Sequence, residues 1–246
     1  MTGYRKELKY IVSDAVLTDI RGRISPLMRR DEHQKGDHYR IRSIYFDSPT
    51  FTCYRENQAG VSPREKYRIR TYDCSEDTIK AEIKIRYRDT ISKMSTRISR
   101  DLFDRLVLKE RSEAVSALLD LSDNMQAGPG EGADTASDRV LEKYLVRIMN
   151  EMYAPSCIVD YERCAYVYDI GNVRVTFDRN ITVSHEYDRM FDDKCSGKAV
   201  LSDNMHILEI KYDEFLPDEI KMILAGVGLE RSSCSKYALC CDPLSV

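Results

Sequence analysis

Three stretches decide the fold class of this 246-residue chain: EKYRIRTY at residues 65–72, KAEIKIRYR at 80–88 and ISKMSTRIS at 91–99. In each segment charged or polar residues alternate with apolar ones, which is the pattern of a β-strand with one apolar face. The links between them are short and polar. Three such strands in succession predict an antiparallel β-meander.

The charges on these strands gather on one face, because side chains two residues apart in a strand point the same way. Three further segments repeat the arrangement, at residues 4–12, 172–178 and 206–213. The charged faces of the six strands are Lys66, Arg68 and Arg70; Glu82, Lys84 and Arg86; Lys93, Ser95 and Arg97; Arg174, Thr176 and Asp178; Glu209 and Lys211; and Arg5, Glu7 and Lys9.

The rest of the chain supplies more strands and several helices. Alternation predicts strands at residues 39–46, 157–169 and 181–187 as well. Helical spacing predicts helices at 14–28, with Ser13 as N-cap, at 51–57, 100–121 and 137–152, and at 216–229, with Pro217 at its start. Residues 128–132 (GPGEG) indicate a loop, and residues 232–240 a last strand or a cover. No βαβ alternation is present.

This element order predicts the α+β class, with an eight-stranded antiparallel β-barrel and inserted and flanking helices. We expect a single domain over residues 1–246, with a helical insertion at about residues 100–152. A single barrel domain of this length is common.

Composition excludes several functions. The net charge is −3 and the isoelectric point about 5.9, which argues against a nucleic-acid-binding protein. The eight cysteines form no CxxC pair, so neither a zinc site nor a disulfide framework is predicted. No leader and no long apolar run is present, and we expect a cytoplasmic protein with no membrane span. The chain also lacks the GxxxxGK[ST] phosphate loop.

Rows of like charge on adjacent strands indicate a polar interior. Amphipathic strands usually turn their charges to water, but Lys and Arg at positions i, i+2 and i+4 repel one another. A bound polyanion would neutralise them. We therefore expect the basic rows to line the barrel and the apolar rows to face outward, against the helices. The sixteen tyrosines are expected on the barrel exterior and rim.

Three Glu-x-Lys pairs add carboxylates to these rows. They are Glu7 with Lys9, Glu82 with Lys84, and Glu209 with Lys211. Carboxylates in a basic tunnel can hold a divalent cation that bridges phosphate oxygens. The alternative is that each pair is an ordinary ion pair, which at a surface contributes roughly 0–1 kcal/mol.

An ordered set of segments gives the chain a family resemblance. This set resembles the VTC domain. Its segments are YRKELKY (4–10), RSIYFDS (42–48), YRIRTY (67–72), AEIKIRYRD (81–89), SKMSTRIS (92–99), YERCAY (161–166), VRVTFDRNI (173–181), ILEIKYDE (207–214) and CSKY (234–237). This domain is the polyphosphate polymerase branch of the CYTH-like triphosphate tunnel superfamily. The resemblance implies an eight-stranded tunnel, a divalent metal (Mn²⁺ or Mg²⁺), and ATP and inorganic polyphosphate or triphosphate as ligands.

The resemblance also implies roles for individual residues. The catalytic basic residues would be Lys9, Arg68, Arg70, Lys84 and Arg174. Further phosphate contacts would come from Lys66, Lys93, Arg97, Arg163, Lys211 and Lys236, with either Lys93 or Arg97 at one family position. The metal carboxylate would be Glu209, aided by Glu82 or Glu7.

One departure separates branches of the superfamily. Hydrolytic and cyclase relatives open with Glu-x-Glu-x-Lys, whereas this chain has Arg5 at the first of these positions. Loss of that carboxylate weakens the case for metal-activated water and suits a phosphate nucleophile. The expected activity is transfer of the γ-phosphate of ATP to polyphosphate with release of ADP. A tripolyphosphatase or organic-triphosphate hydrolase, and a non-catalytic polyphosphate- or nucleotide-binding protein, remain alternatives.

Overall fold

The computed structural model describes all residues except 1–4, 33, 127–134, 196, 233 and 242–246. The loop expected at residues 128–132 therefore lies outside the described residues. Within the described part of the chain, eight long strands form one antiparallel ring. In chain order they are β1 (Arg5–Ser13), β3 (Tyr39–Asp47), β4 (Arg64–Tyr72), β5 (Ile79–Tyr87), β6 (Thr90–Ile98), β7 (Ala154–Tyr168), β8 (Val173–Ser184) and β10 (Met205–Tyr212).

Three pairings between strands far apart in the sequence, β3–β7, β1–β6 and β1–β10, hold the ring together. The order is β7-β3-β4-β5-β6-β1-β10-β8, and β8 pairs with β7 again. At the β1–β6 seam, Arg5 and Lys6 are the described residues of β1 that pair, opposite Ile91 and Thr90. The two-residue strands β2 (Arg29–Arg30) and β9 (Lys198–Ala199) extend β7 and β8. The predicted α+β barrel is confirmed.

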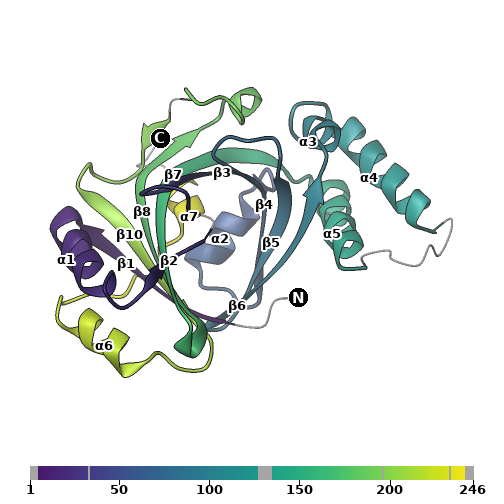
Figure 1. Ribbon diagram of the computed structural model, residues 1–246. Helices are drawn as coiled ribbons and strands as arrows, with labels where there is room; N and C mark the ends of the chain where they lie inside the picture. Colours follow the sequence, from purple (N-terminus) through teal and green to yellow (C-terminus); the bar gives the residue numbers. More distant parts are fainter. Residues whose placement is uncertain (1–4, 33, 127–134, 196, 233, 242–246) are drawn as a thin grey trace.

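Helices cover the outside of the ring on two sides (Figure 1). On one side lie α1 (Asp14–Ile24) and α6 (Asp218–Ala225), and on the other α3 (Arg100–Val107), α4 (Arg111–Gln126) and α5 (Thr135–Glu151). The short helices α2 (Thr52–Gln58) and α7 (Lys236–Cys241) contact each other and lie within the outline of the ring. They lie across one end of the barrel.

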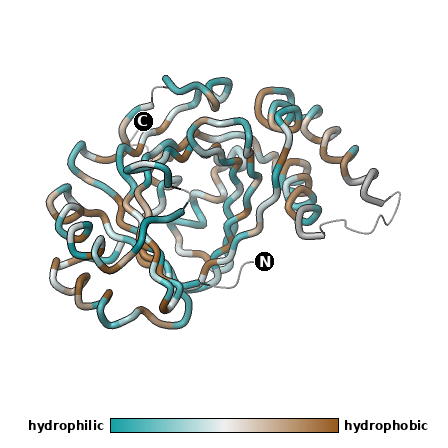
Figure 2. The backbone as a smooth tube through the Cα atoms, in the orientation of Figure 1, coloured by the Kyte–Doolittle hydropathy of each residue, from teal (hydrophilic) through white to brown (hydrophobic). Residues whose placement is uncertain are grey.

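The apolar faces of the strands pack outward, as the alternation predicts. Ile69, Ile83 and Met94 pack in a cluster with residues of α3, α4 and α5, while Phe177, Leu208 and Ile210 pack with α1 and α6. Hydrophilic and hydrophobic positions alternate along these strands (Figure 2). Burial of an apolar side chain of this size stabilises a fold by about 1.5–3 kcal/mol. The hydrophobic core therefore surrounds the outside of the ring, and polar groups occupy the ring interior.

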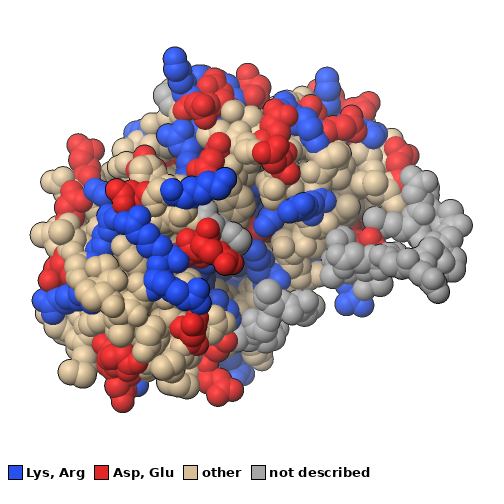
Figure 3. All heavy atoms as spheres, in the orientation of Figure 1, with Lys and Arg blue, Asp and Glu red and all other residues tan. Residues whose placement is uncertain are grey.

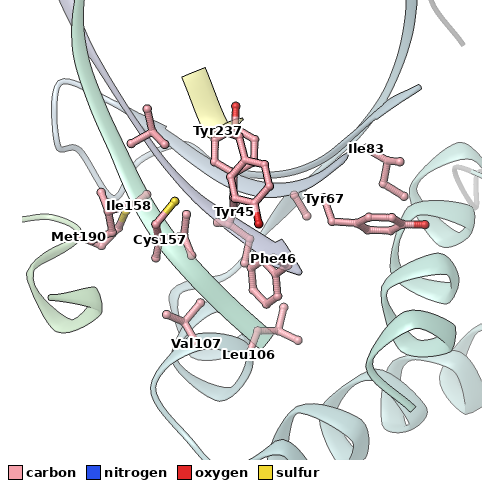
Figure 4. Packing of buried hydrophobic residues seen from close by; sticks show 14 of the residues in the cluster. Tyr45, Phe46, Tyr67, Ile83, Leu106, Val107, Cys157, Ile158, Met190 and Tyr237 are labelled. Carbon is pink, nitrogen blue, oxygen red and sulfur yellow. The ribbon is translucent and has the colours of Figure 1, made fainter. Parts of the chain in front are cut away.

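Aromatic rings pack in the outer hydrophobic core beside α5 and at the end of the barrel beside α7 (Figure 4). Tyr67 and Phe46 each meet Tyr144 of α5 edge-on, with ring centroids 5.2 and 5.5 Å apart. At the covered end Tyr45 and Tyr237 of α7 stack at 4.9 Å. Such pairs contribute about 0.5–1.5 kcal/mol beyond their buried area. They hold α5 and α7 in fixed positions against the barrel.

Two sequence-based expectations about elements are wrong in detail, and for a third segment the structure decides between the two alternatives. The helix expected at residues 100–121 is two helices, because the chain turns at residues 108–110 so that α3 and α4 pack on each other. The strands expected at residues 172–178 and 181–187 are one strand, β8, with an irregularity beside Asn180, whose φ is 51°. The segment expected as a strand or cover at residues 232–240 is the covering helix α7, which begins at Lys236.

Hydrogen-bonded caps begin two of the helices. Ser13 accepts a hydrogen bond from the amide of Val16, which confirms the predicted cap, and Ser99 accepts one from the amide of Leu102 at 3.1 Å. These side chains satisfy amides that have no partner inside the helix.

Replacement of Ser99 by alanine is expected to lower the free energy of unfolding by about 1 kcal/mol, because one α3 amide loses its acceptor. Urea unfolding measures this as a lower midpoint with an unchanged slope. An unchanged midpoint would show that the cap contributes nothing to the fold.

Candidate functional site

A cavity of about 820 Å³ runs through the ring, and Lys and Arg side chains gather around its opening (Figure 3). Among the described residues, fifteen Lys and Arg side chains line it, against five of Asp and Glu. The basic residues are Arg5, Lys9, Arg64, Lys66, Arg68, Arg70, Lys80, Lys84, Arg86, Lys93, Arg97, Arg163, Arg174, Lys211 and Lys236. The expected orientation of the basic rows is thus observed.

Two carboxylates on neighbouring strands form an acidic centre within this basic lining. Glu7 of β1 and Glu209 of β10 are both about 4% exposed. Lys9 lies 3.4 Å from an oxygen of Glu7 and 3.7 Å from one of Glu209. Lys211 contacts both carboxylates, and Lys84 donates to Glu7 at 2.9 Å. Three ammonium groups therefore surround two carboxylates.

The surrounding charges set the protonation of the acidic centre. Burial and the neighbouring Glu209 act to raise the pKa of Glu7, but Lys84, Lys9 and Lys211 outweigh them and lower it to about 2. Burial lowers the pKa of Lys84 to about 7, although Glu7 opposes this change. Glu7 is therefore an anion at neutral pH, and Lys84 gives up its proton more readily than an ordinary lysine.

Glu82 on β5 holds a second group of cations. It is fully buried, and one of its oxygens accepts hydrogen bonds from the Nε and Nη2 atoms of Arg68 at 2.9 and 2.6 Å. Its other oxygen accepts from Lys93 at 2.9 Å, and Arg70 lies 3.9 Å away. Burial acts to raise the pKa of Glu82, but these three cations lower it well below its usual value. Glu82 thus fixes the orientation of the Arg68 guanidinium group within the ring.

The covering helix α7 contributes to a third group. Arg163 of β7 donates to both oxygens of Asp178 at 2.6 and 2.7 Å, and the ammonium group of Lys236 pairs with the same carboxylate. Asp178 is fully buried. Burial acts to raise its pKa, but Arg163 and Lys236 lower it. The first residue of α7 therefore reaches into the ring from its covered end.

Comparison with known families agrees with this basic tunnel. The family model of the VTC domain matches residues 4–244, which is nearly the whole chain. The chain belongs to the VTC domain family. Membership of this family supports a function related to triphosphate or polyphosphate and a phosphoryl-transfer enzyme. No curated protein is significantly similar to this VTC domain in sequence.

Solved structures resemble this VTC domain over almost its full length, at low identity. A protein of Pyrococcus horikoshii OT3 is 16% identical, with 96% of this chain and 97% of that chain covered and a TM-score of 0.46. A putative adenylate cyclase of Vibrio parahaemolyticus is 12% identical, with 97% and 98% covered and a TM-score of 0.46. A conserved hypothetical protein of Pyrococcus furiosus is 11% identical, with 96% and 99% covered and a TM-score of 0.47.

The structure brings the residues predicted from the sequence of this VTC domain to one cavity. All eleven predicted basic residues line it, as do Glu7 and Glu209. Glu82, which was expected to aid a metal ion, lies behind this lining, and both of its oxygens are occupied by cations. Of the two candidates for one family position, Lys93 donates a hydrogen bond to Glu82. Arg97 is exposed and pairs across the β5–β6 ladder with Lys80.

Four tyrosines line the cavity, contrary to the expectation that tyrosines lie only outside and at the rim. They are Tyr39, Tyr45, Tyr72 and Tyr161. Tyr39 accepts a hydrogen bond from Arg174 at 3.1 Å, and Arg174 also pairs with Asp31. Tyr39 and Tyr45 escape prediction because β3 has no charged residue among those that line the cavity, so charge does not mark its inward face.

Sequence reasoning also left Arg64, Lys80 and Arg86 without a role, although all three line the cavity. A signal for them was present. Each is two residues from a predicted site residue on β4 or β5, and alternation carries the inward face to the ends of a strand.

Among the residues that the structure describes, no helix is both long and apolar enough to cross a membrane. In the same residues no group of three or more His, Cys, Asp or Glu side chains is placed to hold a metal ion. All eight cysteines are free, and six of them are buried, in agreement with the predicted absence of a disulfide framework.

Proposed function

We propose that this VTC domain transfers the γ-phosphoryl group of ATP to the end of an inorganic polyphosphate chain and releases ADP. The observation that carries the proposal is the excess of fifteen Lys and Arg over five Asp and Glu side chains around one cavity, counted among the described residues. An excess of this kind on facing strands is costly without a ligand, because like charges repel. A chain of phosphates supplies the missing negative charge along the whole tunnel. We further propose that the protein acts in the cytoplasm.

The charges of the site favour a phosphate nucleophile over water. Glu7 and Glu209 are surrounded by lysines and have pKa values far below neutrality, so both are weak bases. Arg5 lines the cavity where a hydrolase would carry a further carboxylate, and its Nε donates to Asp213 at 2.8 Å. The end of a polyphosphate chain is already anionic. It attacks without a general base.

In the proposed reaction a terminal oxygen of polyphosphate attacks the γ-phosphorus in line. The bond from the γ-phosphorus to the β–γ bridging oxygen breaks, and ADP leaves with the electron pair. Arg68 and Arg70 present guanidinium groups to the phosphoryl oxygens, and Arg68 is already oriented by Glu82. Preorganised cations of this kind stabilise charge in the transition state without reorganisation.

The acidic centre fits the donor set of a divalent cation. Mg²⁺ is usually held by one or two carboxylates together with substrate phosphates and water. Glu7 and Glu209 share Lys9 and Lys211 as partners, so the two carboxylates lie within reach of a common cation. We propose that they hold Mn²⁺ or Mg²⁺, which would act as a Lewis acid on phosphate oxygens. We do not assign Glu82 to the metal ion, because its oxygens accept hydrogen bonds from Arg68 and Lys93.

Product analysis tests the proposed function. The protein is incubated with ATP and Mn²⁺ or Mg²⁺, and products are separated on a polyacrylamide gel with and without added polyphosphate. Long polyphosphate together with ADP is the expected result. Orthophosphate without polymer would replace the proposal by a triphosphate hydrolase of the same fold. Tight binding of ATP without any turnover would replace it by a non-catalytic binding protein.

Binding of a polyanion is expected to draw a proton to Lys84. The free protein loses this proton as the pH rises through about 7, whereas bound phosphate favours the charged form. Affinity for tripolyphosphate should therefore fall by up to about tenfold per pH unit above pH 7, relative to a Lys84→Arg variant that stays charged. Calorimetry in buffers of different ionisation enthalpy measures the uptake directly. Equal proton uptake by both proteins would contradict this role of Lys84.

A further inference from the structure

The chain just before α7 is held against β1, beside the lysines of the tunnel. The amide of Ser232 donates to the carbonyl of Lys9 at 2.8 Å, and Arg231 forms a β-bridge with Tyr10. Ser235 follows and directly precedes the first residue of α7. It is partly buried and lines the cavity. A hydroxyl group is therefore fixed in the wall of the tunnel.

Ser235 and Lys66 form a hydroxyl–amine pair in this wall. The Nζ atom of Lys66 donates to the Oγ atom of Ser235 at 2.6 Å and to the side-chain oxygen of Asn57, on α2, at 2.7 Å. All three residues line the cavity. A nucleophile within hydrogen-bond reach of a base, with the base oriented by a third group, is the arrangement that activates serine hydroxyls in enzymes. Serine and lysine form such pairs on several unrelated folds.

The surroundings of Lys66 favour the neutral amine that a base requires. Burial has the largest effect and lowers the pKa of Lys66 well below its usual value. Lys9 on β1, Lys84 on β5 and Arg64 on β4 act in the same direction. The thiol of Cys53 on α2 opposes them. Lys66 therefore gives up its proton more readily than an ordinary lysine, and the lone pair of Nζ can then accept a proton from the hydroxyl at 2.6 Å.

The same hydroxyl has a second role at the start of α7. The amide of Ala238 donates to the Oγ atom of Ser235, although at 3.4 Å this bond is long. A capping contact of this kind uses a lone pair of the oxygen and leaves the hydroxyl proton for another acceptor. The cap therefore positions the Ser235 oxygen without using its proton.

The other serines of the cavity have different partners. Among the described residues three serines line the cavity, and the other two are Ser75 and Ser92. Ser75 donates to the carboxylate of Asp77 in an exposed contact, and the hydroxyl of Ser92 has no hydrogen-bond partner in the same part of the chain. Ser235 is thus the serine of the described lining whose hydroxyl contacts an amine.

Phosphate bound in the tunnel would lie beside this pair. Lys9 and Lys84 are two of the lysines that the proposed function assigns to phosphate, and their charges are close enough to Lys66 to lower its pKa. Lys9 also acts on the thiol of Cys234, the residue before Ser235. A terminal phosphoryl group held by Lys9 and Lys84 is therefore next to the Ser235 hydroxyl.

We propose that Ser235 is a self-phosphorylation site, with Lys66 as its general base, and that its phosphoryl donor is a nucleoside triphosphate bound in the tunnel. This assignment rests on the proposed function for its donor. A bond forms between Oγ of Ser235 and the γ-phosphorus, and the bond from that phosphorus to the β–γ bridging oxygen breaks. The electron pair leaves with the nucleoside diphosphate, and the hydroxyl proton moves to Nζ of Lys66.

The phosphorylated side chain is stabilised where it forms. A phosphoserine carries a charge of about −1.5 to −2 at neutral pH and has three strong acceptor oxygens. Lys66, protonated by the reaction, lies next to it, and Lys9 and Lys84 supply further positive charge. The covalent phosphate therefore does not remain as an unpaired buried anion.

Labelling of the protein tests the site. The full chain is incubated with Mg²⁺ and ATP that carries radioactive phosphorus at the γ-position, without polyphosphate, and is then denatured and separated on a gel. We expect label on the protein, a mass increase of one phosphoryl group, and a fragment spectrum that places it on Ser235. Ser235→Gly should abolish the label, and glycine is tolerated at helix N-caps. Ser99→Gly, which removes the cap of α3 outside the cavity, is the matched control and should be labelled normally.

Two further variants separate chemistry from folding. Ser235→Thr keeps a hydroxyl and should still be labelled. Lys66→Arg keeps the positive charge but cannot accept a proton, so labelling should be slower by about 100-fold or more. Wild-type labelling should rise with pH and level off once Lys66 is neutral. In Lys66→Arg it should keep rising, by about tenfold per pH unit, because the ionised hydroxyl alone then reacts. Lys9, Lys84 and Arg64 titrate in both proteins, so the difference between the two profiles reports Lys66.

Three outcomes would overturn the assignment. A wild-type protein without covalent label, or with label on another residue, would remove Ser235 as the acceptor. A Lys66→Arg variant with the rate and pH profile of the wild type would remove Lys66 as the base. The product gel is run on the same reactions and decides the proposed function separately. Polymer without labelled Ser235 would sink this inference alone, and labelled Ser235 without polymer would uphold it while replacing the polymerase assignment.

Discussion

Replacement of Arg70 by alanine is expected to lower the rate of phosphoryl transfer by roughly 100- to 1,000-fold, the loss seen when one preorganised charge donor is removed from an active site. Arg70 lines the cavity and is 7% exposed, and its Nε and Nη2 donate to Ser43 and Tyr161 at 3.0 and 3.2 Å. Its guanidinium group is thus fixed before substrate arrives. Steady-state rates of ADP release measure the effect.

Two further variants bracket the role of Arg70. Arg70→Lys keeps the charge but loses the planar fork, so we expect an intermediate rate. Arg111→Ala removes an exposed arginine at the start of α4 and should leave the rate unchanged. The melting temperature of Arg70→Ala should stay close to that of the wild type, because Arg68 and Lys93 still neutralise Glu82. A near-normal rate for Arg70→Ala would refute the assignment.

Replacement of Glu82 by glutamine should cost about 3–5 kcal/mol of folding free energy, since breaking a buried ion pair leaves its partner charges uncompensated. Glu82 is fully buried, and it is the carboxylate shared by Arg68, Arg70 and Lys93. Glutamine has almost the same size, so the loss reports charge more than packing. Denaturant unfolding monitored by circular dichroism measures it.

A ligand should restore much of the stability that Glu82→Gln loses. Tripolyphosphate supplies negative charge to the same cations, and any ligand that binds only the folded state stabilises it by mass action. The increase in melting temperature on adding tripolyphosphate should therefore be larger for Glu82→Gln than for the wild type. Glu110→Gln, at an exposed position between α3 and α4, is the matched control. A variant as stable as the wild type without ligand would show that Glu82 does not hold these cations.

The strands and the orientation of their basic rows could be predicted from the sequence. On β4, β5 and β6 every second residue is charged or polar, and the repulsion within those rows already indicated an interior filled by an anion. The catalytic role of these residues is a prediction that biochemical experiments have to test. The family resemblance added Arg163 and Lys236, which lie in segments where alternation alone gives no row of cations.

The rest depended on contacts that no local pattern encodes. On β3 the charged residues point outward: Arg42 is fully buried, pairs with Asp160, and donates to the carbonyls of residues 189, 190 and 192. A rule that charges face the tunnel therefore fails on this strand and hides Tyr39 and Tyr45. The turn between α3 and α4 has no Gly or Pro, so only the packing of the two helices reveals it.

The closure of the ring has a consequence for how the molecule assembles. The first strand pairs with β10, and the contact between Arg5 and Asp213 joins positions 208 residues apart. Contacts of such long sequence separation form slowly, because the intervening chain loses much of its freedom first. During synthesis on the ribosome the edge of β1 that pairs with β10 must wait unpaired until that last strand has been made. Completion of the tunnel is therefore a late event in folding, and a partly synthesised chain lacks the closed ring in which phosphate would bind.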